Sequence, residues 1–350
     1  MNHKELIIQQ NISARDALNI INNSALPRIT LFIVDSNNTL LGTLAEGDIR
    51  RGLLNELPLS EKVTSFINKT YTFFSVNGND FEIFEKCIKN GIRFVPVLSS
   101  DKKIQDIIDT SILNAMIPAT AVLMAGGKGE RLKPYTDKIP KPLLKVGPKS
   151  IIDYNIENLK KSGISDFNFT VKHMAKDISD HISQNFSHLI QANFILEDEP
   201  RGTAGSLSEV KNLKYNHVIL MNSDLLTNID FADMFRKMLE SDADLVMATV
   251  PYYVDVPYAV INVGESDEIN SLSEKPRYTY YSNAGIYIFK KEVIDFVPKQ
   301  GKYDATDLVN DLIAKGKKII SFPITGYWLD IGRTEDFMKA QHDINYINFK

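Results

Sequence analysis

Residues 120–144 read TAVLMAGGKGERLKPYTDKIPKPLL. A short apolar run, 121–124, ends at the glycine-rich segment 125–129, and such a run bounded by glycines is typical of a buried strand. Glycines let backbone N–H groups approach a ligand closely, and convergent N–H groups bind phosphates. The stretch therefore predicts a strand that leads into a phosphate-binding loop.

The spacing of this loop differs from that of two common phosphate-binding loops. A Walker A loop would need Ser or Thr after Lys128, where Gly129 stands. The dinucleotide fingerprint would need a third glycine where Leu132 stands. We therefore predict a third kind of loop, flanked by two cations, Arg131 and Lys141.

Composition places the chain among ordinary globular proteins. It has 350 residues, of which 43% are hydrophobic and 24% charged. Its net charge is −4, so it lacks the excess of positive charge that is typical of nucleic-acid-binding proteins. The N-terminal MNHKELIIQQ does not resemble a signal peptide, and no run approaches the ~18 apolar residues that span a bilayer. We expect a cytoplasmic protein without a nucleic-acid or membrane partner. Its one cysteine, Cys87, has apolar neighbours at helical spacing, which predicts a buried thiol.

The first 117 residues show a tandem repeat of about 60 residues. Each copy has a helix, a strand, a turn and a second strand, with strands expected at 30–34 and 40–44, then at 93–98 and 104–108. This pattern resembles a pair of CBS domains, regulatory modules that often bind adenosine nucleotides. In that family a Thr and a ribose-contacting Asp follow the second strand. In the first copy of this chain the Asp is present as Asp48, but Ala45 replaces the Thr. The second copy lacks the Asp. An adenosine ligand, regulation and dimerisation all stay open, and a homo-oligomer is expected.

From Thr120 onward, strands alternate with helices. We expect helices at 151–161 and 230–240 and strands at 167–171, 194–196, 217–221 and 245–250. This alternation predicts an α/β fold with a mostly parallel, Rossmann-like sheet flanked by helices, with ligands at the carboxyl ends of the strands. The predicted domains are 1–117, the smaller α/β CBS pair, and 118–350.

Polar side chains follow the predicted strands or stand in small-residue motifs. Asp224, after 217–221, suits Mg²⁺ or caps the next helix. Asp330, in the segment WLDIG, needs a cation beside it or caps a helix near Thr334. The segment 197–205, EDEPRGTAG, could seat a flat base or form a solvated turn.

Two further motifs contain groups that could bind a phosphorylated sugar. Glu274 could accept hydrogen bonds from sugar hydroxyls, and Lys275 could hold a phosphate. In isolation this pair is equally typical of an exposed charged turn. The segment Asn283-Ala284-Gly285 follows.

Taken together and in this order, these motifs are similar to those of the sugar-1-phosphate nucleotidyltransferase family, over about residues 120–336. That family joins a nucleoside triphosphate to a sugar 1-phosphate and releases pyrophosphate. The resemblance implies that Arg131 holds the leaving phosphates, Lys141 contacts the α-phosphate, and Asp224 and Asp330 bind Mg²⁺. It also implies nucleotide-binding and sugar-phosphate-binding sets, which are Ala125, Gly126, Gly127, Gly129, Glu197, Gly202 and Thr203, and Glu274, Lys275, Asn283 and Gly285.

Glu197 bears on the choice of base. Relatives that use uridine or thymidine nucleotides have Gln five residues before the glycine of the G-T motif, and here that position is Glu197. An ionised carboxylate only accepts hydrogen bonds, and guanine offers two adjacent donors. Glu197 therefore favours GTP, with UTP, dTTP or CTP as alternatives.

The remaining choices concern the sugar and the class of protein. A CBS pair before such a domain resembles bacterial enzymes of surface-glycan or legionaminic acid synthesis, which favours glucosamine 1-phosphate or mannose 1-phosphate, with a heptose 1-phosphate open. Little chain follows Asp336, so we expect no hexapeptide-repeat domain. An adenylate-sensing CBS regulator on a non-catalytic scaffold is the alternative class.

Overall fold

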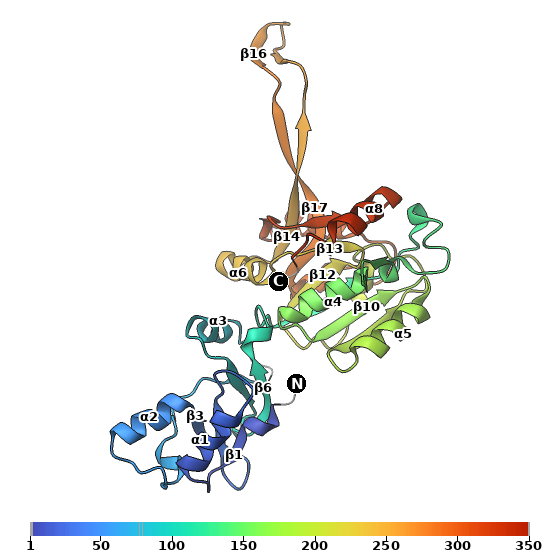
Figure 1. Cartoon of the computed structure of the whole chain (residues 1–350). Helices are drawn as coiled ribbons and strands as arrows, with labels where there is room; N and C mark the ends of the chain where they lie inside the picture. The colour runs from blue at the N-terminus through green and yellow to red at the C-terminus, as the bar shows by residue number, and fades with distance from the viewer. Residues whose placement is uncertain (1–2, 77, 79, 349–350) are drawn as a thin grey trace. The chain divides into compact units, whose positions relative to one another are not determined.

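The computed structural model describes residues 3–76, 78 and 80–348. The chain divides into two compact units (Figure 1). The N-terminal unit comprises Met1–Pro118 with Lys161–Gly163, and the C-terminal unit comprises Ala119–Lys160 with Ile164–Lys350. Among the described residues, no helix has the length and apolar character needed to cross a membrane.

The N-terminal unit contains two three-stranded sheets of the same design. In each sheet the first two strands are parallel and the third is antiparallel. The strands are β1 (Ile7–Gln9), β2 (Leu31–Val34) and β3 (Leu40–Leu44), then β4 (Phe74–Ser75), β5 (Phe94–Leu98) and β6 (Ile104–Asp109). The helices are α1 (Ala14–Asn23), α2 (Glu46–Leu54) and α3 (Phe81–Lys89). This design confirms the small α/β repeat expected from the sequence.

Local sequence explains where the first helix begins. Ser13 and Asp16 form a capping box, in which Asp16 N–H donates to Ser13 Oγ at 3.2 Å and Ser13 N–H donates to Asp16 Oδ2 at 3.3 Å. Ala14 and Ala17 are fully buried and let the helix pack closely on the sheet residues Phe32 and Ile33. Cys87 is fully buried on α3, as predicted.

The C-terminal unit is built on a seven-stranded sheet with the order β11-β10-β7-β12-β17-β14-β18. β17 pairs antiparallel with both of its neighbours, and the other pairings are parallel. The strands are β7 (Ala119–Met124), β10 (Asp166–Val171), β11 (Gln191–Leu196), β12 (His217–Asn222), β14 (Leu245–Asp255), β17 (Arg277–Lys290) and β18 (Ile319–Pro323). This confirms the predicted mostly parallel sheet.

Helices cover both faces of this sheet. His217 lies edge-on to Phe235 of α6, with ring centroids 5.0 Å apart, whereas Val218 packs in one cluster with Leu308 of α7. Successive strand residues point to opposite faces, so α6 and α7 lie on opposite sides. The helices are α4 (Ile151–Lys161), α5 (Ala175–Phe186), α6 (Phe231–Ser241), α7 (Ala305–Ala314) and α8 (Thr334–Asp343).

Two long strands run beyond the sheet. β14 and β17 stay paired from Thr249–Asn283 to Asp255–Arg277. They lead into a terminal hairpin of β15 (Val260–Val263) and β16 (Ile269–Ser273). Figure 1 shows this projection standing away from the rest of the C-terminal unit, and we call residues 251–282 the arm. We expected the strand to end at Val250, but the structure extends it to Asp255.

The Cys87 thiol gives a direct check of the N-terminal core. Burial raises its pKa to about 11, so at pH 8 it is mostly a protonated thiol that reagents cannot reach. We predict that Cys87 reacts with a thiol reagent only after denaturation. Rapid labelling of the native protein at pH 8 would contradict this packing.

Candidate active site

The glycine-rich loop begins where β7 ends. Ala125 N–H donates to Thr170 O at 2.8 Å, which fastens the start of the loop to β10. Gly129 has φ of +65°, and a β-carbon placed on it would lie 2.9 Å from Thr136 Cγ2. Thr136 Oγ1 also donates to Gly129 O at 2.8 Å. A glycine is therefore needed at position 129 for both conformation and space.

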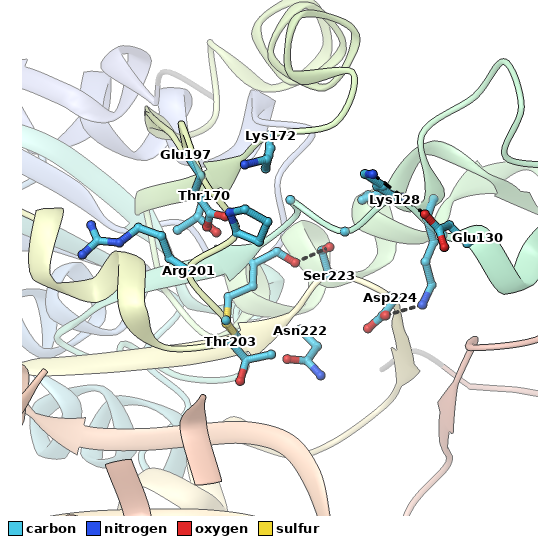
Figure 2. A pocket seen from close by; sticks show the side chains of 18 residues that line it. Lys128, Glu130, Thr170, Lys172, Glu197, Arg201, Thr203, Asn222, Ser223 and Asp224 are labelled. Carbon is cyan, nitrogen blue, oxygen red and sulfur yellow. Dashed lines mark hydrogen bonds and ion pairs between the residues drawn. The ribbon is translucent and has the colours of Figure 1, made fainter. Parts of the chain in front are cut away.

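A cavity of about 510 Å³ opens beside this loop. Its walls come from the loop and from the carboxyl ends of β10, β11 and β12, as expected for ligands of a parallel sheet. Among the lining residues are Gly126, Gly127, Lys128, Gly129, Lys141, Lys172, Glu197, Gly202, Thr203, Asn222 and Asp224. Figure 2 shows Lys172 and Glu197 at one end of the cavity and Asp224 at the other.

Asp224 and Lys141 form the charged end of the cavity. Lys141 Nζ is paired with Asp224 Oδ2, and the lysine is only 8% exposed. The other oxygen, Asp224 Oδ1, is buried and has no hydrogen-bond partner in the described structure. A buried carboxylate oxygen without a donor is costly, so this atom is suited to a ligand.

Asp330 is brought beside Asp224 by a short strand pair. β13 (Leu225–Thr227) pairs antiparallel with β19 (Trp328–Asp330), so that Leu225 lies opposite Asp330. Ile331 N–H donates to Asp224 O at 3.1 Å. The two carboxylates therefore lie at the same edge of the sheet, although the chain separates them widely.

The electrostatics at Asp330 point to a missing positive charge. Although Asp330 keeps an exposed surface, its pKa is raised, first by the partial loss of solvent around the carboxyl group and then by the negative charge of Asp224. Lys141 and Arg131 oppose this rise, which places both cations close to Asp330. Asp224 Oδ1, which has no hydrogen-bond partner in the described structure, and the Asp330 carboxylate are hard oxygen donors of the kind that Mg²⁺ prefers.

The two carboxylates, Asp224 and Asp330, suit Mg²⁺ better than a metal ion whose ligands are all protein side chains. Within the described ranges, no group of three or more His, Cys, Asp or Glu side chains could hold a metal ion. Mg²⁺ in phosphate chemistry is commonly bound by one or two carboxylates, with phosphate oxygens and water as the other ligands. Asp224 and Asp330 match that donor set.

The opposite end of the cavity is organised by Glu197. Glu197 Oε1 accepts a hydrogen bond from Ser206 Oγ at 2.6 Å, and Oε2 lies 3.2 Å from where a β-carbon on Gly126 would stand. Lys172 Nζ donates to Asp198 O at 2.8 Å and lines the same end. A side chain at position 126 would thus fill the space in front of Glu197.

The Gly202–Gly205 segment is held by the start of α7. Gly202 has φ of +76°, and a β-carbon there would lie 2.6 Å from both Tyr303 O and Asp304 Oδ1. Thr203 N–H donates to Asp304 Oδ1 at 3.0 Å, and Ala204 N–H donates to Tyr303 O at 3.0 Å. The small residues of the Gly202–Gly205 segment are therefore explained in part by close packing against Tyr303 and Asp304.

The structure also brings the Asn283-Ala284-Gly285 and Trp328–Asp330 segments together. Trp328 Nε1–H donates to Ala284 O at 2.9 Å, and Gly285 N–H donates to Asn283 Oδ1 at 2.9 Å. A β-carbon on Gly285 would lie 2.7 Å from Asn222 Nδ2, and Asn222 lines the cavity. Gly285 therefore borders the cavity edge at Asn222.

Four expected site residues, besides Asp330, Asn283 and Gly285 described above, do not line the cavity. Ala125 is buried behind the loop, and Arg131 is exposed on the turn Glu130–Leu132, close to Asp330. Glu274 and Lys275 lie on the arm. Arg277 is six residues along β17 from Asn283, which corresponds to roughly 20 Å of strand. Glu274 and Lys275 lie beyond Arg277 on the arm, so the structure does not bring them to the cavity.

Several residues that line the cavity were not predicted as site residues from the sequence, although some belong to the motifs noted there. Lys172 and Asn222 stand where β10 and β12 end, and polar residues just after predicted strands were the available signal. Ser223 is buried and its Oγ–H donates to Met124 O at 2.6 Å, which ties the Asp224 segment to the end of β7. The other lining residues that were not predicted are Met124, Lys128, Glu130, Pro142, Thr170, Pro200 and Arg201.

Comparison with known proteins identifies the family. The model of the nucleotidyl transferase family matches residues 120–346. The chain belongs to the nucleotidyl transferase family. A CBS domain model matches residues 1–55.

Curated relatives of this nucleotidyl transferase differ in their nucleotide. A mannose-1-phosphate guanyltransferase of Debaryomyces hansenii is 30% identical over 235 residues, covering 63% of this chain and 62% of the relative. A UTP–glucose-1-phosphate uridylyltransferase of Synechocystis is 27% identical, with the same two coverages. A glucose-1-phosphate adenylyltransferase of Clostridium perfringens is 25% identical, covering 64% of this chain and 65% of the relative. The chain thus spans about 62–65% of the length of these relatives.

Solved structures show the same fold. HddC from Yersinia pseudotuberculosis is 28% identical with a TM-score of 0.50, covering 65% of this chain and 99% of that one. A structure of HddC complexed with GMP-PN is 26% identical with a TM-score of 0.50 and the same coverage.

The raised pKa of Asp330 gives a testable stability effect. Above its folded-state pKa the carboxylate is charged at a cost, and this cost is lost as the pH falls through that pKa. We predict that Asp330→Asn raises the melting temperature of the metal-free protein at pH 7, and that the gain shrinks on acidification. Asp137→Asn, an exposed carboxylate on the neighbouring loop, is the matched control. Equal or lower stability of Asp330→Asn at pH 7 would contradict the electrostatic account.

Proposed function

We propose that this protein transfers a nucleotidyl group from a nucleoside triphosphate to a sugar 1-phosphate, releasing pyrophosphate and giving a nucleotide sugar. The observation that carries the proposal is the cavity itself. It joins a glycine-rich loop, an acceptor end at Glu197 and a charged end at Lys141 and Asp224, with Asp330 adjacent. These are the groups needed for a base, a triphosphate and a metal ion.

The proposed reaction is a direct in-line transfer. A phosphate oxygen of the sugar 1-phosphate attacks the α-phosphorus, a new oxygen–phosphorus bond forms, and the bond to the β-phosphate bridging oxygen breaks. The electron pair leaves with pyrophosphate. Because two anions must meet, positioning and charge stabilisation supply the catalysis, and no covalent nucleophile is needed.

Each residue then has a defined task. Backbone N–H groups at Gly126, Gly127 and Gly129 hold phosphate oxygens. Lys141, fixed by Asp224, faces the α-phosphate, where charge develops. Arg131, on the exposed turn, holds the departing β- and γ-phosphates.

A bound Mg²⁺ would neutralise phosphate charge in this site. Asp224 Oδ1, which has no hydrogen-bond partner in the described structure, and the Asp330 carboxylate beside it would hold the ion. Asn283 and Gly285, beside Asn222, form the edge of the cavity proposed for the sugar.

We propose GTP as the preferred nucleotide. Ser206 orients Glu197 Oε1, which can accept a second hydrogen bond, and Oε2 can accept hydrogen bonds as well. The pair can therefore accept from the two adjacent N–H donors of guanine, whereas uracil and thymine present a mixed edge. Uridylyl-, adenylyl- and guanyltransferases all occur among the relatives, so the base assignment depends on Glu197, with the GMP-PN complex of HddC in agreement.

The sugar is proposed as glucosamine 1-phosphate or mannose 1-phosphate, for surface-glycan or legionaminic acid synthesis. The mannose-1-phosphate guanyltransferases among the relatives support mannose 1-phosphate.

For the N-terminal unit we propose regulation or dimerisation. Asp48, the residue expected at a ribose, accepts from Ala45 N–H at 2.8 Å and pairs with Arg51 at 2.5 Å, so the start of α2 already uses it.

The direct test is pyrophosphate release across four nucleoside triphosphates and the glucosamine, mannose and heptose 1-phosphates. We predict the highest kcat/KM with GTP. Glu197→Gln should lower kcat/KM for GTP by roughly tenfold to a hundredfold, as expected for loss of a charged acceptor worth ~1.5–3 kcal/mol, and should improve use of UTP or dTTP.

Glu199→Gln is the matched control, because Glu199 is exposed on the same segment and does not line the cavity. Wild-type turnover with UTP or dTTP that equals or exceeds turnover with GTP contradicts the base assignment. Absence of pyrophosphate release with every pair contradicts the proposed reaction.

A further inference from the structure

Lys172 differs from the other basic side chains that line the cavity. Three of those side chains are paired with a carboxylate, namely Lys128 with Glu130, Lys141 with Asp224, and Arg201 with Glu209. In the described part of the chain, the Lys172 ammonium has no carboxylate partner and donates instead to a backbone carbonyl, Asp198 O, at 2.8 Å. An ammonium has three N–H donors, so Lys172 has two donors left for a ligand.

The sheet places Lys172 beside Glu197. Lys172 stands directly after β10, two residues beyond Thr170, which also lines the cavity, and residues two apart on a strand point to the same face. Val171 lies opposite Leu196, and Glu197 N–H donates to Val171 O at 2.9 Å. Lys172 and Glu197 therefore leave neighbouring parallel strands side by side, at the same end of the cavity (Figure 2).

Lys172 and Glu197 have opposite charges, yet they are not paired with each other in the described structure. Ser206, which is 3% exposed, donates to Glu197 Oε1, and Asp198 O accepts from Lys172. A β-carbon on Gly126 would lie 3.2 Å from Glu197 Oε2 and 3.5 Å from Lys172 Cβ. A glycine thus keeps open the space in front of this donor and this acceptor.

A lysine donor beside a carboxylate acceptor fits a base in which a carbonyl oxygen adjoins a ring N–H. Guanine has this order, O6 and then N1–H, and its 2-amino group offers the carboxylate a second donor. Uracil and thymine have a carbonyl on each side of the N–H, so one carbonyl would face the carboxylate. Adenine and cytosine have an amino group where guanine has O6, and an ammonium cannot donate to an amino group that is itself a donor.

We propose that Lys172 is a specificity-determining residue that selects a base with an oxygen at this position. The inference rests on the proposed function, in which the cavity binds a nucleoside triphosphate with its base at Glu197. Lys172 keeps one N–H on Asp198 O and donates another to O6 of guanine, while Glu197 accepts from N1–H and the 2-amino group. Lys172 then separates GTP from ATP and CTP, whereas Glu197 separates GTP from UTP and dTTP.

The test is calorimetric titration of the full chain with the Mg²⁺ complexes of GTP, ITP and ATP, without a sugar phosphate. ITP keeps O6 and N1–H of GTP but lacks the 2-amino group. Lys172→Met should weaken GTP and ITP binding by the same factor, roughly tenfold to a hundredfold, because both nucleotides lose a contact to O6. The affinity for ATP should not fall, because ATP has no oxygen at this position.

The ratio of the GTP and ITP affinities separates a direct contact from a structural role. If Lys172 only held the Asp198 segment in place, and through it Glu197, then Lys172→Met would remove the preference for the 2-amino group. GTP and ITP would then bind equally, and the proposal would be overturned. Glu197→Gln is the variant in which the two affinities are expected to converge.

Two variants control for charge and for folding. Lys172→Arg keeps a cation that can donate to O6 and should retain most of the GTP affinity. Lys176→Met should bind all three nucleotides like the wild type, because Lys176 lies on α5, pairs with Asp180 and does not line the cavity.

Because the titration needs no turnover, this inference and the proposed function can fail separately. The expected affinities without pyrophosphate release in any substrate pair would contradict the proposed reaction and support the role of Lys172. Unchanged GTP affinity in Lys172→Met overturns that role. A wild-type protein that binds none of the three nucleotides also overturns it.

Discussion

The pairing of Lys141 with Asp224, with Asp330 beside it, is the constraint on which the site depends. A lysine that is 8% exposed needs a carboxylate, and Asp224 supplies one oxygen while its other oxygen has no donor in the described structure. Asp330 adds a second carboxylate, whose pKa is raised by partial loss of solvent and then by the negative charge of Asp224. Among the described residues, the only buried cation beside these two carboxylates is Lys141, with the exposed Arg131 near Asp330, so a divalent cation together with phosphate charge suits this end of the cavity.

The fold makes this arrangement possible because parallel strands end at the same edge. β7, β10, β11 and β12 deliver the glycine loop, Lys172, Glu197 and Asn222 to one cavity. Ser223 fastens the Asp224 turn to the end of β7. The antiparallel strand β17 has a different consequence, since it places Asn283 and Gly285 at the same edge and then continues into the arm.

Local patterns in the sequence were enough to predict the strands and the loop. The apolar runs 121–124 and 217–221 predicted buried strands, and the glycines and Asp224 directly after them predicted a ligand site. Pairing between segments far apart in the chain could not be predicted from these local patterns. The β13–β19 pair that joins Asp224 to Asp330, and the Tyr303–Asp304 segment that holds Gly202, depend on contacts between distant residues. The arm was missed because TVPYYVD has the residues of an ordinary strand, and only its lack of covering layers distinguishes it.

Metal-dependent nucleotide binding tests the central claim most directly, namely that Asp224 and Asp330 form a divalent-cation site at the phosphate end. The measurement is the thermal unfolding of wild type and of Asp224→Asn with GTP, each with and without Mg²⁺. Ligand binding to the native state raises its stability. The account predicts that Mg²⁺ adds to the GTP stabilisation of the wild type and adds nothing in Asp224→Asn. An equal Mg²⁺ effect in both proteins would contradict it.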